Sequence, residues 1–124
     1  MMEQNLTGKE GEEEARKYLQ DRGYDIFHVN WRWKHYELDI VAAQEDELVV
    51  VEVKTRSEDF LLSPEESVDR DKIRRLIAAA DVYVRYFGRN MPVRFDIITL
   101  IKSESGYEIE HIEDAFHPTL KRRR

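Results

Sequence analysis

Two carboxylates and a lysine stand where adjacent β-strands would bring them together. Asp39 lies in one apolar run, and Glu52 and Lys54 lie in another over residues 48–55. Side chains alternate along a strand, so Glu52 and Lys54 share one face while the valines beside them face the other way. Carboxylates next to a lysine are typical of sites that hydrolyse phosphodiesters with the help of a metal ion. Such a site requires secondary-structure elements that bring these three side chains together.

A hairpin is the element that would join the two acids. Residues 36–41 and 48–55 each have the pattern of a strand, and the polar residues 44–47 between them suit a turn. We expect Asp39 to face away from Leu38 and Ile40 and to lie beside Glu52.

Oxygen ligands of this kind favour Mg²⁺, with Mn²⁺ as its substitute. Asp39, Glu52 and the carbonyl group of Val53 would bind the ion, and Lys54 would polarise the attacking water or stabilise charge on the phosphate. The alternative is an ordinary ion pair on a solvated sheet, because exposed ion pairs are common and weak.

A helix is predicted over residues 7–19, where Thr7 and Glu10 form a capping-box pattern and Gly23 ends the helical segment. Two glycines in its first turns predict that its backbone closely approaches a sheet or a ligand. Glu12 lies at this approach and would supply a third carboxylate.

A second helix is predicted over residues 63–87, with Ser63 as its N-cap. Its apolar residues recur with a 3.6-residue period, so one face should pack on the sheet. Several basic residues lie near its start, and such a run is ordinarily a solvated face. They are Arg70, Lys72, Arg74 and Arg75.

Aromatic and basic residues alternate just before the Asp39 strand. Trp31, Arg32 and Trp33 stand here, and exposed rings in this segment could stack on unpaired bases. Packing in the core is the expected fate of at least one of the tryptophans.

The C-terminal part of the chain predicts a strand over residues 93–101 and a last strand over residues 107–112. Arg94 and Asp96 share a face of the first strand and are interpreted as an ion pair at the rim of the sheet. The four histidines show no metal-ligand spacing, so we expect ordinary surface or loop residues. They are His28, His35, His111 and His117.

Several separated motifs together resemble a known family. These motifs are Gly8-x-x-Gly11-Glu12-Glu13-x-Ala15, Asn30-Trp31-Arg32, Glu37-Leu38-Asp39-Ile40-Val41, Val51-Glu52-Val53-Lys54-Thr55-Arg56, Val68-x-x-x-Lys72 and Arg94-Phe95-Asp96. In type and order they resemble the YraN-like bacterial family of predicted endonucleases, which belongs to the PD-(D/E)XK superfamily and is similar to archaeal Holliday junction resolvases. One departure is Tyr36, at a position that is commonly Gly in such proteins.

The resemblance implies an α/β fold with a restriction-endonuclease-like αβββαβ core, a mixed sheet flanked by helices. It also implies that Asp39, Glu52 and Lys54 are the catalytic set, that Glu12 is the acid carried by the helix, and that Lys72 contacts a phosphate near the site.

Length and composition narrow the interpretation further. The 124 residues fit a single domain, here residues 1–120 followed by a basic tail, residues 121–124. The chain has no cysteine, which excludes disulfides, thiolate zinc sites and cysteine nucleophiles and is compatible with the cytoplasm. No apolar run is long enough to span a membrane, so no membrane partner is expected.

Net charge argues against a nucleic-acid enzyme. It is −6, and it becomes −10 once the four cations of the tail are set aside, whereas proteins that hold many phosphates are usually basic. Acids of a metal site account for part of this excess, because a bound cation reverses the local sign.

The sequence thus predicts a cytoplasmic, Mg²⁺-dependent endonuclease that acts on DNA at branched or single-stranded features, with a homodimer as one possible assembly. In this hypothesis Arg56 and Lys72 steady the scissile phosphate, and Arg32 and Trp31 contact the substrate. The alternative is a binding or scaffold module that has the nuclease fold without catalysis.

Overall fold

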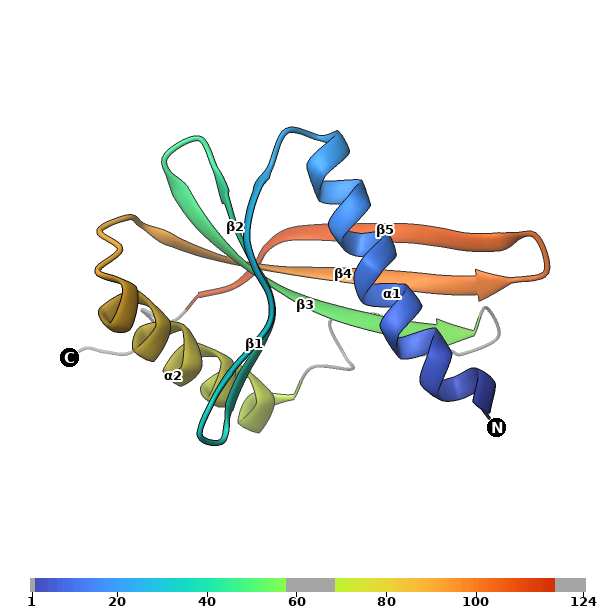
Figure 1. Cartoon of the computed structure of the whole chain (residues 1–124), viewed down its shortest axis with the longest axis horizontal. Helices are drawn as coiled ribbons and strands as arrows, with labels where there is room; N and C mark the ends of the chain where they lie inside the picture. The colour runs from blue at the N-terminus through green and yellow to red at the C-terminus, as the bar shows by residue number, and fades with distance from the viewer. Residues whose placement is uncertain (1, 58–68, 118–124) are drawn as a thin grey trace.

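The computed structural model describes residues 2–57 and 69–117, with side chains described from Gly8 onward. Five strands form one sheet in the order β1-β2-β3-β4-β5. The elements are α1 (Met2–Asp21), β1 (Asp25–Trp33), β2 (Tyr36–Gln44), β3 (Glu47–Ser57), α2 (Arg70–Phe87), β4 (Val93–Ser103) and β5 (Gly106–Phe116) (Figure 1). The predicted mixed sheet is confirmed, because β3 and β4 are parallel and the other neighbours are antiparallel.

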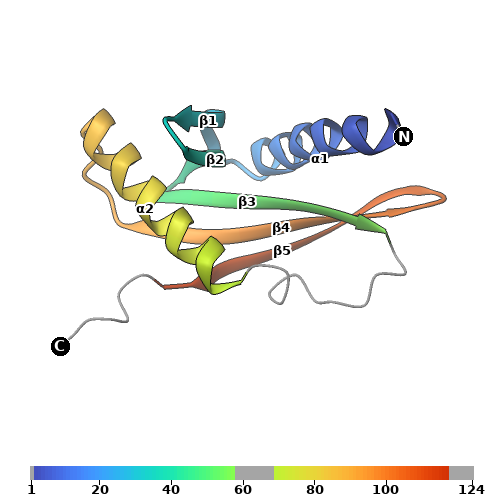
Figure 2. The same ribbon diagram turned by 90° about the horizontal axis from the view of Figure 1, so that it is seen from below.

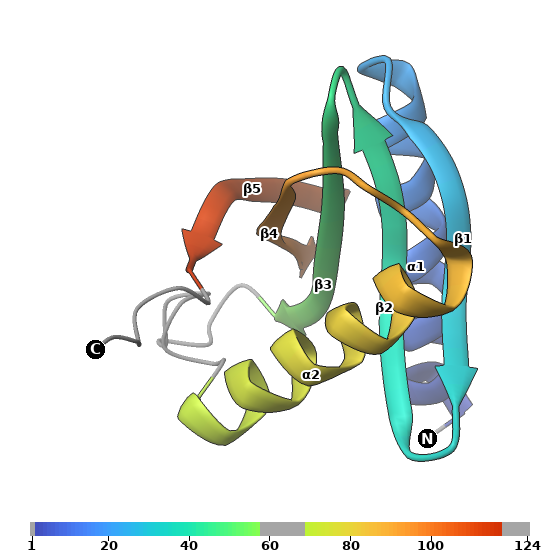
Figure 3. The ribbon, with the colours of Figure 1, turned by 90° about the vertical axis from the view of Figure 1, so that its left-hand side faces the viewer.

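The two helices cover opposite faces of the sheet. Figure 3 shows α2 in front of β2 and α1 behind it, and Figure 2 shows how strongly the sheet twists between the β1–β2 hairpin and the other strands. Each helix has its own apolar core. The α2 core includes Leu38, Val50 and Tyr83, and the α1 core includes Leu19 and Val51.

The central strand β3 begins with four fully buried apolar residues, 48–51, that alternate between the two cores. A strand covered on both faces is expected to be apolar throughout. Glu52 follows directly after this run and is also buried. A buried acid is unusual in a strand that is covered on both faces.

Helix α1 reaches the sheet at a glycine. A Cβ atom at Gly11 would overlap the hydroxyl oxygen of Thr55 in β3, whereas a Cβ at Gly8 would meet nothing. The predicted close approach is therefore confirmed at Gly11 only. This approach places the next residue, Glu12, over the end of β3.

The predicted start of the first helix is wrong, and that of the second falls outside the described residues. Helix α1 begins at Met2, upstream of the capping-box pattern at Thr7, and ends at Asp21 before Gly23. Residues 2–6 include several good helix formers, so the helix extends through the pattern. Residue 63 lies outside the described residues, and α2 begins at Arg70.

Helix α2 is capped at both ends. The backbone of Asp69 is extended, and its carboxylate accepts a 2.9 Å hydrogen bond from the amide of Lys72, which is the geometry of an N-cap. Gly88 ends the helix in the left-handed conformation. The cap fixes where the basic residues of the first turns stand.

No helix in the described part of the chain is long and apolar enough to cross a membrane.

Candidate active site

The two acids meet where β2 and β3 separate. The antiparallel pairing of these strands ends at Ile40 and Val51, and the next position in the same register holds Asp39 and Glu52. Residues at opposed positions of an antiparallel pair are close neighbours. The predicted hairpin therefore brings the two carboxylates together at its open end.

The strand is irregular at Asp39. Leu38 packs in the α2 core and Ile40 in the α1 core, so the alternation of side chains breaks between them and the prediction that Asp39 faces away from both is wrong. Asn30 falls opposite Asp39 in the β1–β2 register and has a positive φ of 57°. Asn tolerates this left-handed conformation better than most residues do.

The Glu52 carboxylate is buried between two lysines. Its side chain is only 6% exposed, and its Oε2 atom lies 3.6 Å from Nζ of Lys54 and 3.3 Å from Nζ of Lys72. Lys54 is in the same strand as Glu52, and Lys72 is in helix α2, which covers one face of the sheet. A buried carboxylate requires partners of this kind, and the pairs connect the candidate site to the first turn of α2.

Asp39 carries an unfavourable charge in this environment. Its Oδ2 atom accepts a 2.9 Å hydrogen bond from the backbone amide of Val53. Burial, and then the negative charge of Glu52, nevertheless raise the pKa of Asp39 to about 7. The hydrogen bond and the more distant Lys72 only partly offset these effects. Asp39 therefore favours a bound proton or a nearby cation.

Glu12 faces the same cavity from α1. Burial raises its pKa, followed by the charge of Glu37, while Arg32 lowers it and Glu52 adds a smaller increase. Among residues 8–57 and 69–117, no three acidic or histidine side chains converge closely enough to form a metal-binding group. Glu12 therefore stands near the two strand carboxylates, without completing a cluster with them.

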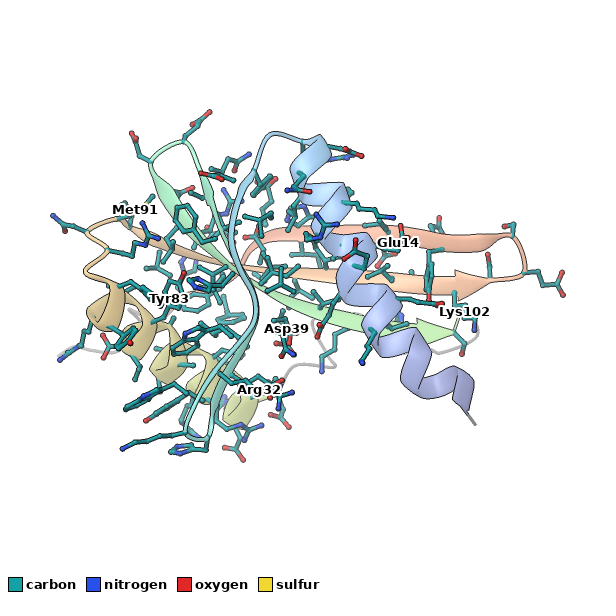
Figure 4. The ribbon with its side chains drawn as sticks, viewed as in Figure 1. Glu14, Arg32, Asp39, Tyr83, Met91 and Lys102 are labelled. Atoms are coloured by element: carbon teal, nitrogen blue, oxygen red, sulfur yellow. The ribbon has the colours of Figure 1, made fainter. Side chains whose placement is uncertain are left out.

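A cavity of about 860 Å³ opens over these residues. Among the described residues that line it, five are basic and three are acidic, so this described part of the lining is positive while the whole chain is negative. Figure 4 labels Asp39, Arg32 and Lys102 around it. The cavity is lined by Gly8, Lys9, Glu12, Asn30, Arg32, Asp39, Glu52, Val53, Lys54, Thr55, Arg56, Ser57 and Lys102.

The donor set suits a hard divalent cation. Asp39, Glu52 and Val53 border the cavity, and the first two are carboxylates whose mutual repulsion an ion would relieve. We regard these residues as fitting Mg²⁺ or Mn²⁺ through two carboxylates, with Glu12 nearby.

Three of the four predicted substrate-binding residues lie at the cavity, and the fourth does not line it. Arg32 and Arg56 line the cavity, and Lys72 stands at its border through its contact with Glu52. Trp31 does not line it. Its half-buried ring packs edge-on against Tyr83 of α2, at a centroid distance of 5.2 Å, and the contact of Trp31 with substrate stays a prediction.

Sequence reasoning did not assign six of the lining residues to the site, namely Gly8, Lys9, Asn30, Thr55, Ser57 and Lys102. Lys102 comes to the cavity because it pairs with Ser57 in the parallel β3–β4 register, which nothing in the local sequence reveals. Asn30 could have been suspected, because Asn within an apolar strand often marks a left-handed backbone position.

A second buried polar group lies away from the cavity. Asp96 is fully buried, and Arg94 donates to it through Nε and Nη2, each at 2.9 Å. The predicted ion pair is confirmed. His111 Nε2 lies 2.8 Å from Asp96 Oδ2, so the expectation that His111 is a surface residue is wrong. His28 likewise bonds to the Tyr83 hydroxyl group from within β1.

The fold and the site together define the class of protein. The αβββαβ order followed by β5, the mixed sheet, and the carboxylates at the open end of the β2–β3 hairpin are consistent with a restriction-endonuclease-like core.

Comparison with known proteins adds the family. The chain belongs to the uncharacterised protein family UPF0102, whose model matches residues 11–100. A UPF0102 protein of Parabacteroides distasonis is 68% identical over 117 residues, covering 94% of this chain and 97% of the relative. One of Bacteroides thetaiotaomicron is 54% identical over 120 residues, covering 97% and 99%. One of Flavobacterium psychrophilum is 43% identical over 117 residues, covering 94% and 98%.

These matches confirm the family relationship that the motifs predicted. The family description and the names of these relatives state no activity.

Proposed function

We propose that this chain is a Mg²⁺-dependent endonuclease of the PD-(D/E)XK type that hydrolyses phosphodiester bonds of DNA at branched or single-stranded features. The observation that carries the proposal is the pairing of Asp39 and Glu52 at the open end of the hairpin, with Lys54 3.6 Å from Glu52. The positive lining of the surrounding cavity, on a chain of net charge −6, supports an anionic substrate.

Each residue of the site has a defined part in this proposal. Asp39, Glu52 and the Val53 carbonyl group would hold the cation, with Glu12 as a further acid. When bound, Mg²⁺ supplies Lewis acidity for attack of water on the phosphodiester. Lys54 stabilises the negative charge that develops on the phosphate in the transition state.

The remaining cations position the substrate. Arg56 and Arg32 line the cavity and would hold phosphate oxygens through guanidinium groups, which bind such oxygens in pairs. Lys72 forms an ion pair with Glu52 and so helps to hold this carboxylate in place. Its ammonium group would also contact the scissile phosphate.

A cleavage assay tests the proposal. We expect the wild-type chain to cut single-stranded, duplex or four-way-junction DNA only when Mg²⁺ or Mn²⁺ is present, and Glu52→Ala to be inactive. Circular dichroism of Glu52→Ala should match the wild type, since Glu52 lies at the cavity and not in an apolar core. Cleavage by Glu52→Ala at the wild-type rate would refute the assignment.

A binding or scaffold module with the same fold is the second candidate. The contacts of Glu52 with Lys54 and Lys72 favour it, because they neutralise this carboxylate without any metal. Such a module would bind its partner equally well with and without divalent cations and would cut none of the three DNA substrates.

A further inference from the structure

A second cavity, of about 270 Å³, lies between the β1–β2 turn and the first turns of α2. In Figure 1 the end of the β1–β2 hairpin projects beside the first turns of α2. We call this cavity the hairpin groove. It is lined by His35, Tyr36, Glu37, Lys72, Arg74, Arg75, Leu76 and Ala78.

Aromatic rings gather at the turn that borders the hairpin groove. Trp33 is 41% exposed, and its ring is nearly parallel to that of Tyr36, with centroids 6.2 Å apart. The His35 ring packs on Tyr36 with centroids 4.3 Å apart, and Nζ of Lys34 lies 4.7 Å from the centre of the Trp33 ring. Exposed rings next to cations are the surfaces on which unpaired bases stack.

The hairpin groove is also positive. Lys72, Arg74 and Arg75 line it from α2, and Glu37 is the one acid among the lining residues that the structure describes. The whole chain has a net charge of −6, so the excess of basic over acidic side chains in the described lining gives the groove a charge opposite in sign to that of the chain. Such a reversal beside exposed rings suits a ligand that has both phosphates and aromatic bases.

Two ion pairs connect the hairpin groove with the active-site cavity. Lys72 lines the groove, and its Nζ atom lies 3.3 Å from Glu52 in the cavity. Arg32 lines the cavity and lies 3.4 Å from Glu37 in the groove. A chain of phosphates could therefore pass from one cavity to the other along these cations.

We propose that the hairpin groove binds the unpaired strand of a nucleic acid beside the phosphate that the active site hydrolyses. The proposal rests on the proposed function and names the part of the substrate that the active site alone does not define. Bases stack on Trp33, which lies outside the groove lining and beside the lining residue Tyr36, while Arg74 and Arg75 contact the phosphates. A paired base has its faces covered by its neighbours, so the groove selects single strands over duplex.

Fluorescence anisotropy without metal tests the groove independently of catalysis. The probes are a fluorescein-labelled oligothymidylate and a labelled DNA hairpin, titrated with the chain in EDTA. We expect tighter binding of the single strand, and Trp33→Ala should weaken it about 5- to 150-fold, the range for loss of one stacked base. Arg75→Ala should lower the slope of log affinity against log salt by about 0.7.

The matched control is Arg85→Ala, which removes an exposed cation from the last turn of the same helix. We expect it to bind the single strand like the wild type. Trp33→Phe keeps an aromatic face and should recover most of the affinity that Trp33→Ala loses. Both positions are exposed, so circular dichroism should show unchanged folding.

The outcomes separate this proposal from the proposed function. Binding of oligothymidylate that depends on Trp33 and Arg75, without cleavage in Mg²⁺ or Mn²⁺, would support the groove and overturn the nuclease. Metal-dependent cleavage, with Trp33→Ala and Arg75→Ala binding the single strand like the wild type, would support the nuclease and overturn the groove.

Discussion

Replacing Asp39 by Asn should stabilise the metal-free fold at alkaline pH. The side-chain oxygen of Asn can still accept the hydrogen bond from the Val53 amide, now 2.9 Å from Asp39 Oδ2. The substitution removes the negative charge that burial and Glu52 make unfavourable. Asn at position 39 therefore keeps the hydrogen bond from the Val53 amide and removes the buried negative charge beside Glu52.

The size of the effect follows from the pKa of Asp39, which rises from 3.8 to about 7 on folding. Between these values the folded state binds an extra proton, so stability falls as pH rises from about 4 to about 7 and then levels off. The full difference corresponds to about 4 kcal/mol. Water in the open cavity screens the charge, so we expect Asp39→Asn to gain about 1–3 kcal/mol at pH 8.

Urea unfolding at pH 5 and pH 8 in EDTA measures this gain. The gain should be larger at pH 8 than at pH 5. Asp46→Asn is the control, because Asp46 lies exposed in the β2–β3 turn, and it should change stability little at either pH. Adding Mg²⁺ at pH 8 should stabilise the wild type and leave Asp39→Asn nearly unchanged, because a ligand stabilises only the state that binds it. A less stable Asp39→Asn at pH 8 in EDTA would refute the reasoning, since the lysines would then already balance both acids.

Two further substitutions test the framework that positions the site. Asp96→Ala should cost about 3–5 kcal/mol in urea unfolding, because it leaves the Arg94 guanidinium, with a side chain only 11% exposed, without its buried partner; a cost near that of an exposed salt bridge would contradict this. Burial by itself would raise the pKa of Asp96, but the bonds that it accepts from His111, Arg94 and the Asp114 amide outweigh burial and hold this pKa below 3.8. Its contribution to stability is therefore present above about pH 4 and is lost as pH falls below that value. Asp69→Ala should cost about 1 kcal/mol through loss of the α2 N-cap; Asp69→Ser should recover most of it, and equal losses in both variants would show that the cap is not the cause.

The strands of the hairpin could be predicted because they lie close in sequence. Alternating apolar residues and a short polar turn set the register, and that register places Asp39 beside Glu52. The break in alternation at Asp39 was not predictable from the strand itself, because the apolar pattern of residues 36–41 gives no sign that Leu38 and Ile40 pack in different cores.

Contacts between distant segments were harder to predict. His111 is buried because Asp96 lies on the adjacent strand, and a lone histidine in a sequence does not reveal such a partner. Lys102 reaches the cavity through the parallel β3–β4 pairing. The predicted N-cap Ser63 lies outside the described residues, and the N-cap that the structure shows for α2, Asp69, was not singled out from the sequence.

Isothermal titration of Mn²⁺ into the metal-free chain tests the central claim most directly. We predict binding by the wild type at pH 8 and none by Asp39→Asn/Glu52→Gln, which keeps the shape of both side chains and removes their charges. Equal Mn²⁺ affinity in the double variant, or no binding by the wild type even with DNA present, would contradict a metal site at the open end of the hairpin and leave the scaffold module as the better account.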